Sequence, residues 1–184
     1  MNTKISLPLS REDAACLKAG DMVSLSGVMY TARDAAHKRL IELLDAGKPL
    51  PFAIEGAAIY YVGPTPPPPG AIIGSAGPTT SSRMDAYTPR LLERGLRVMI
   101  GKGKRSDTVI AAIKQSGALY LGAIGGAGAL LASCIKAVSA IAFDDLGAEA
   151  IRRLVVEDFP TVVLIDTWGT NFYETGRKAY LSHQ

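Results

Sequence analysis

Cysteine is scarce in this chain of 184 residues: Cys16 and Cys134 are its two cysteines, and neither belongs to a CxxC pair. Two thiols cannot build a disulfide scaffold, and alone they cannot hold a structural zinc or an iron–sulfur cluster. We therefore expect two reduced, buried cysteines in a cytoplasmic protein. Aromatic residues are also few, with one tryptophan and no basic run interleaved with aromatics, so nucleic-acid binding is not indicated.

A strong charge imbalance and a long apolar run are missing as well. The net charge of +3 is too small to indicate a nucleic-acid or membrane-surface partner. The longest weakly polar run, residues 116–133, is interrupted by five glycines and predicts a strand, a turn and a buried helix rather than a membrane span. Residues 1–8 lack the apolar segment of a signal peptide. We expect a single domain over residues 1–184.

From residue 70 onward the pattern alternates short strands with helices, which predicts an α/β fold with a parallel or mixed sheet. The earlier part is expected to contain either a strand pair or one long strand, with the bend at Gly27, and a stiff proline-rich surface connection. Strands are expected at 22–32, 57–62, 98–100, 118–122, 140–143 and 162–166. Helices are expected from Ser10 to Gly20 and at 33–46, 83–94, 106–115 and 125–137, with Ser10 and Ser106 as N-caps.

The most informative stretch, residues 77–85, reads GPTTSSRMD and follows a short apolar run. Four consecutive hydroxyl side chains and Arg83 are poor core material but good donors to a carboxylate or phosphate, especially at a helix start with unpaired N–H groups. The alternative is that one serine is only an N-cap, with Asp85 completing a capping box. Because that alternative leaves both threonines unexplained, we favour an anion site.

Glycine-rich turns occur at two further places. Residues 101–105, GKGKR, follow an expected strand, where glycines let a ligand approach the backbone and Lys102 supplies a charge; the alternative is a solvated basic turn. The turn lacks the spacing of a P-loop. Residues 125–128 do not match G-x-G-x-x-G, and we interpret them as a site of close helix packing.

A third basic site stands where a strand is expected to give way to a helix. Arg33 and His37 are four residues apart and share a helix face. An arginine at a helix start opposes the helix dipole, so an anion is expected beside it, which could be Asp34 or a ligand. His37 could be a general acid, a hydrogen-bond donor or a surface residue. The three cations Arg33, Arg83 and Lys102 suit a small dicarboxylate.

Together these stretches resemble the β component of class I, iron–sulfur-dependent fumarate hydratases, and that of the related L-tartrate dehydratases. The resemblance spans about residues 20–175. It rests on RDAAH at 33–37, GPTTSSRMD at 77–85, KG at 102–103, LGAEA at 146–150, VEDFP at 156–160 and ID at 165–166.

The resemblance implies a swivelling β/β/α domain, with a mixed sheet and flanking helices. It implies a hydro-lyase that reversibly hydrates fumarate to L-malate, active only with an α subunit, in a dimer or heterotetramer that involves neither membrane nor nucleic acid. The 4Fe–4S cluster would be carried by that α subunit, not by this chain, and its open iron would act as a Lewis acid. The active site would lie between α and β.

The resemblance also implies roles for single residues. Thr79 is similar to the family's proposed base, an unusual role because a free hydroxyl is hardly ionised at neutral pH. His37 and Asp34 are further candidates without an assigned step. The residues that resemble the substrate-binding group are Arg33, Arg83, Lys102 and Thr80.

Two departures from the family pattern leave the substrate open. Ser82 stands where many relatives have glycine, and Thr170 interrupts a frequent Gly-Asn pair. An L-tartrate dehydratase β subunit is therefore one alternative. A binding module that takes up a dicarboxylate without catalysis is the other.

Overall fold

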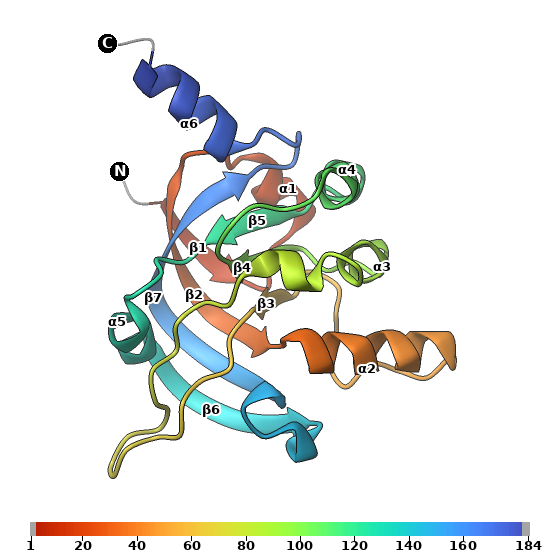
Figure 1. The fold of residues 1–184 in the computed structure, drawn as a ribbon, viewed down its shortest axis with the longest axis vertical. Coiled ribbons are helices and arrows are strands. Elements are labelled where there is room, and N and C mark those ends of the chain that lie inside the picture. Colours follow the sequence, from red (N-terminus) through yellow and green to blue (C-terminus); the bar gives the residue numbers. More distant parts are fainter. Residues whose placement is uncertain (1–2, 182–184) are drawn as a thin grey trace.

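The computed structural model describes residues 3–181, and within them the strands form one seven-stranded mixed sheet (Figure 1). The strands are β1 (Thr3–Leu7), β2 (Met22–Thr31), β3 (Ala58–Tyr60), β4 (Val98–Gly101), β5 (Leu119–Gly122), β6 (Ile135–Ala142) and β7 (Ile151–Ile165). Their order is β1-β2-β3-β4-β5-β7-β6. Neighbours from β1 to β5 pair in parallel, whereas β7 is antiparallel to its partners. The expected mixed sheet with flanking helices is confirmed.

The long strand β7 pairs with β6, β2 and β5 along its length. Because β7 joins β2 as well as β5, strands β2, β3, β4, β5 and β7 form a closed circuit of pairings. The register between β2 and β7 shifts between Leu25 and Gly27. Gly27 has a φ of 118°, and a Cβ there would lie 2.4 Å from the Leu7 carbonyl oxygen. The predicted bend at Gly27 is therefore confirmed.

Six helices and two 3₁₀ segments connect the strands within residues 3–181. Ser10 and Ser106 accept backbone hydrogen bonds as N-caps of the first and fourth helices, as predicted. The helices are α1 (Arg11–Ala15), α2 (Asp34–Asp45), α3 (Thr88–Glu93), α4 (Asp107–Ser116), α5 (Gly128–Ser133) and α6 (Phe172–Leu181), with 3₁₀ segments η1 (Ser81–Met84) and η2 (Asp144–Glu149). None of these helices is long and apolar enough to cross a bilayer.

Both faces of the central strands are buried. Tyr60 and Tyr61 are adjacent and have no exposed surface, yet they belong to different core clusters. Alternate residues of a strand point to opposite faces, so the Tyr61 side chain packs with α2, α3 and α4, which lie together on one side of the sheet (Figure 1). The proline-rich connection after β3 forms an exposed loop, as predicted.

Several predicted boundaries were wrong. The helix at Ser10 ends at Ala15 instead of Gly20, and β1 was not predicted. The helix expected at 125–137 stops at Ser133, and the chain continues as β6 because the small residues there pair with β7. Strand β7 begins at Ile151, well before the expected strand at 162–166. The expected burial of both cysteines was wrong too, since Cys16 is exposed and Cys134 half-buried.

Candidate functional site

The predicted site residues gather at one edge of the sheet. Strands β2, β3, β4 and β5 are parallel, so their carboxyl ends meet at the same edge. Arg33 and Asp34 follow β2, the segment that ends in Thr79 and Thr80 follows β3, and Lys102 follows β4. Parallel α/β sheets, whether open or closed into a barrel, bind ligands beyond the carboxyl ends of their strands, so this edge is the expected location of a small-molecule site.

Asp34 connects the first two cations. Its Oδ1 atom accepts a hydrogen bond of 2.7 Å from Arg83 Nε, and its Oδ2 atom lies 3.8 Å from Arg33 Nε. The Arg33 side chain is 21% exposed and that of Arg83 is 51% exposed. The structure therefore brings together two arginines that are far apart in the sequence, and Asp34 is one of the anions beside Arg33.

Glu149, at the end of η2, was not singled out by the sequence reasoning. One carboxylate oxygen accepts a 3.0 Å hydrogen bond from the Ala35 backbone at the start of α2, and the other lies 3.4 Å from Arg33 Nη2. It thus satisfies an unpaired N–H of the helix start from a distant part of the chain. Its place in the LGAEA stretch at residues 146–150 was the one indication in the sequence that Glu149 matters, and that stretch does not show the contact with α2.

Lys102 lies beside the hydroxyl segment. Thr80 and Lys102 form an isolated parallel bridge, and the Ser81 backbone N–H donates to the Lys102 carbonyl at 2.9 Å. The Thr79 backbone N–H donates to the Tyr61 carbonyl at 2.7 Å. The Lys102 side chain is exposed, and its Nζ is 4.0 Å from where a Gly125 Cβ would lie. The lysine therefore belongs to the same edge as the threonines.

The four hydroxyl side chains are not equivalent. Ser81 has no exposed surface, Thr79 is half-buried, and Thr80 and Ser82 are exposed. The segment enters η1, a 3₁₀ helix of four residues whose N-cap, Thr80, makes no side-chain cap bond. The alternative that a serine caps a helix is therefore wrong. The N–H groups of Thr79 and Ser81 are already bonded, so the expected row of unpaired donors is shorter than predicted.

Asp85 does not complete a capping box either. Its carboxylate accepts hydrogen bonds of 2.7 Å from Arg105 Nε and from the Ser106 backbone. Asp85 therefore helps to hold the start of α4.

His37 is fully buried in the first part of α2, which excludes the surface reading. Its Nδ1 atom lies 2.9 Å from the Arg33 carbonyl oxygen, which can only accept, so Nδ1 carries the proton. Burial lowers the pKa of His37 to about 4, so the ring is neutral near pH 7. Its Nε2 atom is buried without a hydrogen-bond partner in the described part of the chain, as are Arg33 Nε and Asp34 Oδ2.

Of residues 125–128, Gly128 is a site of close packing, against the segment at residues 75–77 rather than against the sheet. A Cβ at Gly128 would lie 2.3 Å from Ser75 Oγ and 3.0 Å from the Gly77 backbone nitrogen. The glycine thus lets the segment that leads into the hydroxyl stretch cross the start of α5.

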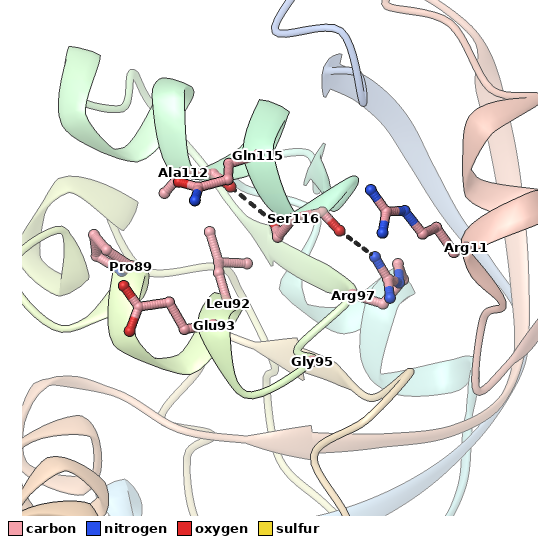
Figure 2. A pocket seen from close by; sticks show the side chains of 9 residues that line it. All are labelled: Arg11, Pro89, Leu92, Glu93, Gly95, Arg97, Ala112, Gln115 and Ser116. Atoms are coloured by element: carbon pink, nitrogen blue, oxygen red, sulfur yellow. Dashed lines mark hydrogen bonds between the residues drawn. The ribbon is translucent and has the colours of Figure 1, made fainter.

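A hollow of about 370 Å³ lies away from this edge, near the amino end of β4 (Figure 2). Arg97, which lines it, donates from Nη1 to the carbonyls of Ser116 and Gly117 at 2.6 and 3.0 Å. The arginine therefore caps the carboxyl end of α4, as Figure 2 shows for the Ser116 contact, and its burial has a structural reason. The lining residues are Arg11, Pro89, Leu92, Glu93, Gly95, Arg97, Ala112, Gln115 and Ser116.

Among residues 3–181, no three His, Cys, Asp or Glu side chains are arranged to hold a metal ion. Cys16 follows α1 and Cys134 follows α5, and each thiol is free. The described residues of this chain therefore do not fit an iron–sulfur cluster.

The fold is an α/β module with basic side chains at the carboxyl ends of its parallel strands. The chain belongs to the fumarase C-terminus family, whose model matches residues 1–176. It is 46% identical over 154 residues to the anaerobic class I fumarate hydratase of Escherichia coli K12, covering 83% of this chain and 28% of that protein. It is 41% identical over 165 residues to fumarate hydratase 2 of Leishmania major, covering 89% of this chain and 29% of that protein.

A third relative has a different length. The chain is 37% identical over 179 residues to a putative L(+)-tartrate dehydratase subunit beta of Methanocaldococcus jannaschii, covering 94% of this chain and 92% of that protein. The chain thus spans under a third of the two fumarate hydratases, and most of the tartrate dehydratase subunit. Its relatives are hydro-lyases by name, and the family identified from the motifs is confirmed.

Proposed function

We propose that this chain is the β component of an iron–sulfur-dependent hydro-lyase that reversibly hydrates fumarate to L-malate. The observation that carries the proposal is the convergence of Arg33, Arg83 and Lys102 at one sheet edge, joined by Asp34 and by the Thr80–Lys102 bridge. These three cations outnumber the two carboxylates beside them, Asp34 and Glu149, so this edge carries a net positive charge, which suits a dianionic substrate. The names of the relatives supply the reaction class.

Arg83 is the strongest candidate to bind a substrate carboxylate. The contacts with Asp34 use its Nε, and within the described residues both Nη groups make no hydrogen bond. Two Nη groups can grip a carboxylate through parallel hydrogen bonds. Arg33, Lys102 and Thr80 complete the proposed substrate-binding group, and in this arrangement Asp34 orients both guanidinium groups.

Thr79 is proposed as the base that removes a proton from the carbon next to the hydroxyl-bearing carbon. Its backbone is fixed by the 2.7 Å bond to the Tyr61 carbonyl, while its side chain is half-buried beside exposed Thr80. Nearby cations would favour the ionised oxygen and the negative charge that develops on the substrate. His37 is not proposed as the base, because burial lowers its pKa to about 4 and so makes its Nε2 lone pair a weak proton acceptor.

The proposal includes a partner. Arg83, Thr80 and Lys102 are exposed at this edge, and this chain spans under a third of its fumarate hydratase relatives. We therefore assign the rest of the active site, with the 4Fe–4S cluster, to an α subunit that covers this edge. In this proposal the chain is a swivelling β/β/α domain, which closes reversibly on the α subunit. A cytoplasmic complex, as a dimer or heterotetramer, belongs to the same proposal.

L-tartrate dehydration is the second candidate. The tartrate dehydratase relative matches this chain over nearly its whole length. Ser82, which is exposed next to Arg83, adds a hydroxyl where many family members have glycine, and a second hydroxyl is what distinguishes tartrate from malate. These two observations keep tartrate open as the substrate.

The test is co-expression with an α-type dehydratase chain from the same genome and assay of the anaerobically purified complex. Fumarate hydration by the complex, and none by either chain alone, is the expected result. Preference for tartrate over malate would select the second candidate. A complex that turns over neither, together with calorimetric binding of malate by the isolated chain, would replace both with a non-catalytic binding module.

A further inference from the structure

One buried side chain, Tyr120, links the two segments that carry the proposed site, residues 79–83 and residues 101–104. Tyr120 projects from β5, has no exposed surface, and places its hydroxyl oxygen 2.9 Å from Ser81 Oγ and 2.8 Å from the Gly103 carbonyl oxygen. Ser81 follows Thr80 in the hydroxyl segment, and Gly103 follows Lys102. A single buried hydroxyl group therefore spans the two segments that present the substrate-facing groups.

The hydrogens at this junction can be assigned by chemistry. The Gly103 carbonyl can only accept, so the one Tyr120 proton is donated to it. The Ser81 hydroxyl must then donate to the Tyr120 oxygen, which fixes the Ser81 rotamer inward. Burial raises the pKa of Tyr120, so its hydroxyl stays protonated. Ser81 is thus removed from the set of donors available to a ligand.

The space around Ser81 is closed on the side of β4. A Cβ at Gly101 would lie 2.0 Å from Ser81 Oγ and 2.9 Å from a ring carbon of Tyr61. Ser81 therefore sits directly on the Gly101 backbone. The Ser81 N–H also donates a 2.9 Å hydrogen bond to the Lys102 carbonyl. The backbone of Ser81 is therefore fixed against β4, and the Tyr120 hydroxyl fixes its side chain.

The ring of Tyr120 is itself held in place by a buried cation. The Arg105 side chain is 0% exposed, and its guanidinium carbon lies 5.0 Å from the centre of the Tyr120 ring and 5.4 Å from that of Tyr61. Arg105 also bonds Asp85 at 2.7 Å and donates to Thr88 Oγ1 at 2.7 Å. A planar guanidinium between two rings restrains the aromatic side chains beneath the site.

We propose that Tyr120 is a positioning residue that sets the spacing between the hydroxyl segment, residues 79–83, and Lys102. The expected effect on kcat rests on the proposed function, whereas the effect on the spacing of the two segments does not. Without the Tyr120 hydroxyl, both loops keep their backbone contact but lose the link that holds Ser81 inward. The substrate-facing groups then sample a wider range of separations, which lowers the rate more than it weakens binding.

The test compares Tyr120→Phe with Tyr60→Phe. Tyr60 is an equally buried tyrosine on the other face of the sheet, and its hydroxyl bonds a single backbone carbonyl, that of Ala76. Hydrogen exchange on the full chain is expected to accelerate in residues 79–83 and 101–104 together in Tyr120→Phe, and in neither set in Tyr60→Phe. In the assembled α–β complex, kcat is expected to fall roughly 10-fold in Tyr120→Phe with KM changed less than about 3-fold.

The two claims fail in distinguishable ways. Unchanged exchange in both segments of Tyr120→Phe overturns the positioning role, whatever the activity. An equal loss of kcat in Tyr60→Phe also overturns it, because any buried hydroxyl would then suffice. If the wild-type complex does not hydrate fumarate, the proposed function fails, while the exchange experiment still decides whether Tyr120 ties the loops. Thermal unfolding of both variants separates global destabilisation from the local effect.

Discussion

Arg83 Nε lies 2.7 Å from Asp34 Oδ1, although 49 positions separate the two residues in the sequence. Asp34 is the first residue of α2 and Arg83 lies in η1, so this contact joins two elements of the proposed site. The Arg83 side chain is half exposed, and such a pair contributes about 1 kcal/mol or less to folding stability. Its importance is therefore expected in the orientation of Arg83 rather than in stability.

The first prediction concerns that orientation. Asp34→Ala is expected to lower kcat/KM for the dicarboxylate substrate about 10-fold, mainly through KM, because the untethered guanidinium loses its alignment. Steady-state kinetics of the α–β complex measure it. Asp145→Ala, which removes the partner of Arg39 in another exposed ion pair, is the matched control and should leave kcat/KM unchanged. Equal kinetics for the two variants would show that Asp34 does not orient Arg83.

The second prediction concerns pH and His37. The folded pKa is about 4 and the ordinary value is 6.5, so between these values the unfolded state binds a proton that the folded state does not. The stabilisation is complete above pH 6.5 and is lost as pH falls toward 4. Between about pH 7.5 and pH 5 the free energy of unfolding should fall by about 2 kcal/mol.

The control for this titration is His37→Gln, measured by urea unfolding at the same two pH values. Asp145 and Asp158 also have pKa values that their partners lower, through Arg39 and Lys4 respectively, but these groups lose stability only at more acidic pH. The variant should therefore lack the loss over this interval. The same loss in His37→Gln and wild type would assign it to other groups.

The third prediction concerns the bend of β2. Gly27→Ala is expected to cost roughly 2–4 kcal/mol, because a Cβ at a φ of 118° would lie 2.4 Å from the Leu7 carbonyl oxygen. Gly47→Ala is the matched control: its φ is 63°, and nothing lies within 4 Å of its Cβ position. That change should cost about 1 kcal/mol. Comparable unfolding free energies for the two variants would mean that the contact with β1 relaxes readily.

The local elements of this fold could be predicted where capping and periodicity act within a short window. Ser10 and Ser106 are such cases, because each bonds an N–H three residues away. The beginning of β7 could not be predicted, since Pro160 interrupts its pattern and its pairing with β2 is non-local. The end of β6 was predicted as a strand, but its start was predicted as part of a helix, because its pairing with the distant β7 cannot be seen within a short window.

The candidate site divides in the same way. The cations Arg33, Arg83 and Lys102 could be found because their residue types are unusual next to strands and glycines. The contacts that organise them could not, because Glu149 and Tyr120 reach the site from elements far away in the sequence. The inward position of Ser81, next to exposed Thr80 and Ser82, also depends on the Tyr120 hydroxyl, which no spacing rule reveals.

The most direct test of the account is the rate of fumarate hydration by the α–β complex with Arg83→Ala in place of the wild-type chain. Loss of charged hydrogen bonds worth about 1.5–3 kcal/mol predicts a decrease in kcat/KM of roughly 10- to 150-fold, with the complex still assembled. Arg90→Ala, which removes an arginine paired with Asp45 on the surface, should hydrate fumarate at the wild-type rate. Wild-type turnover by Arg83→Ala would contradict the account.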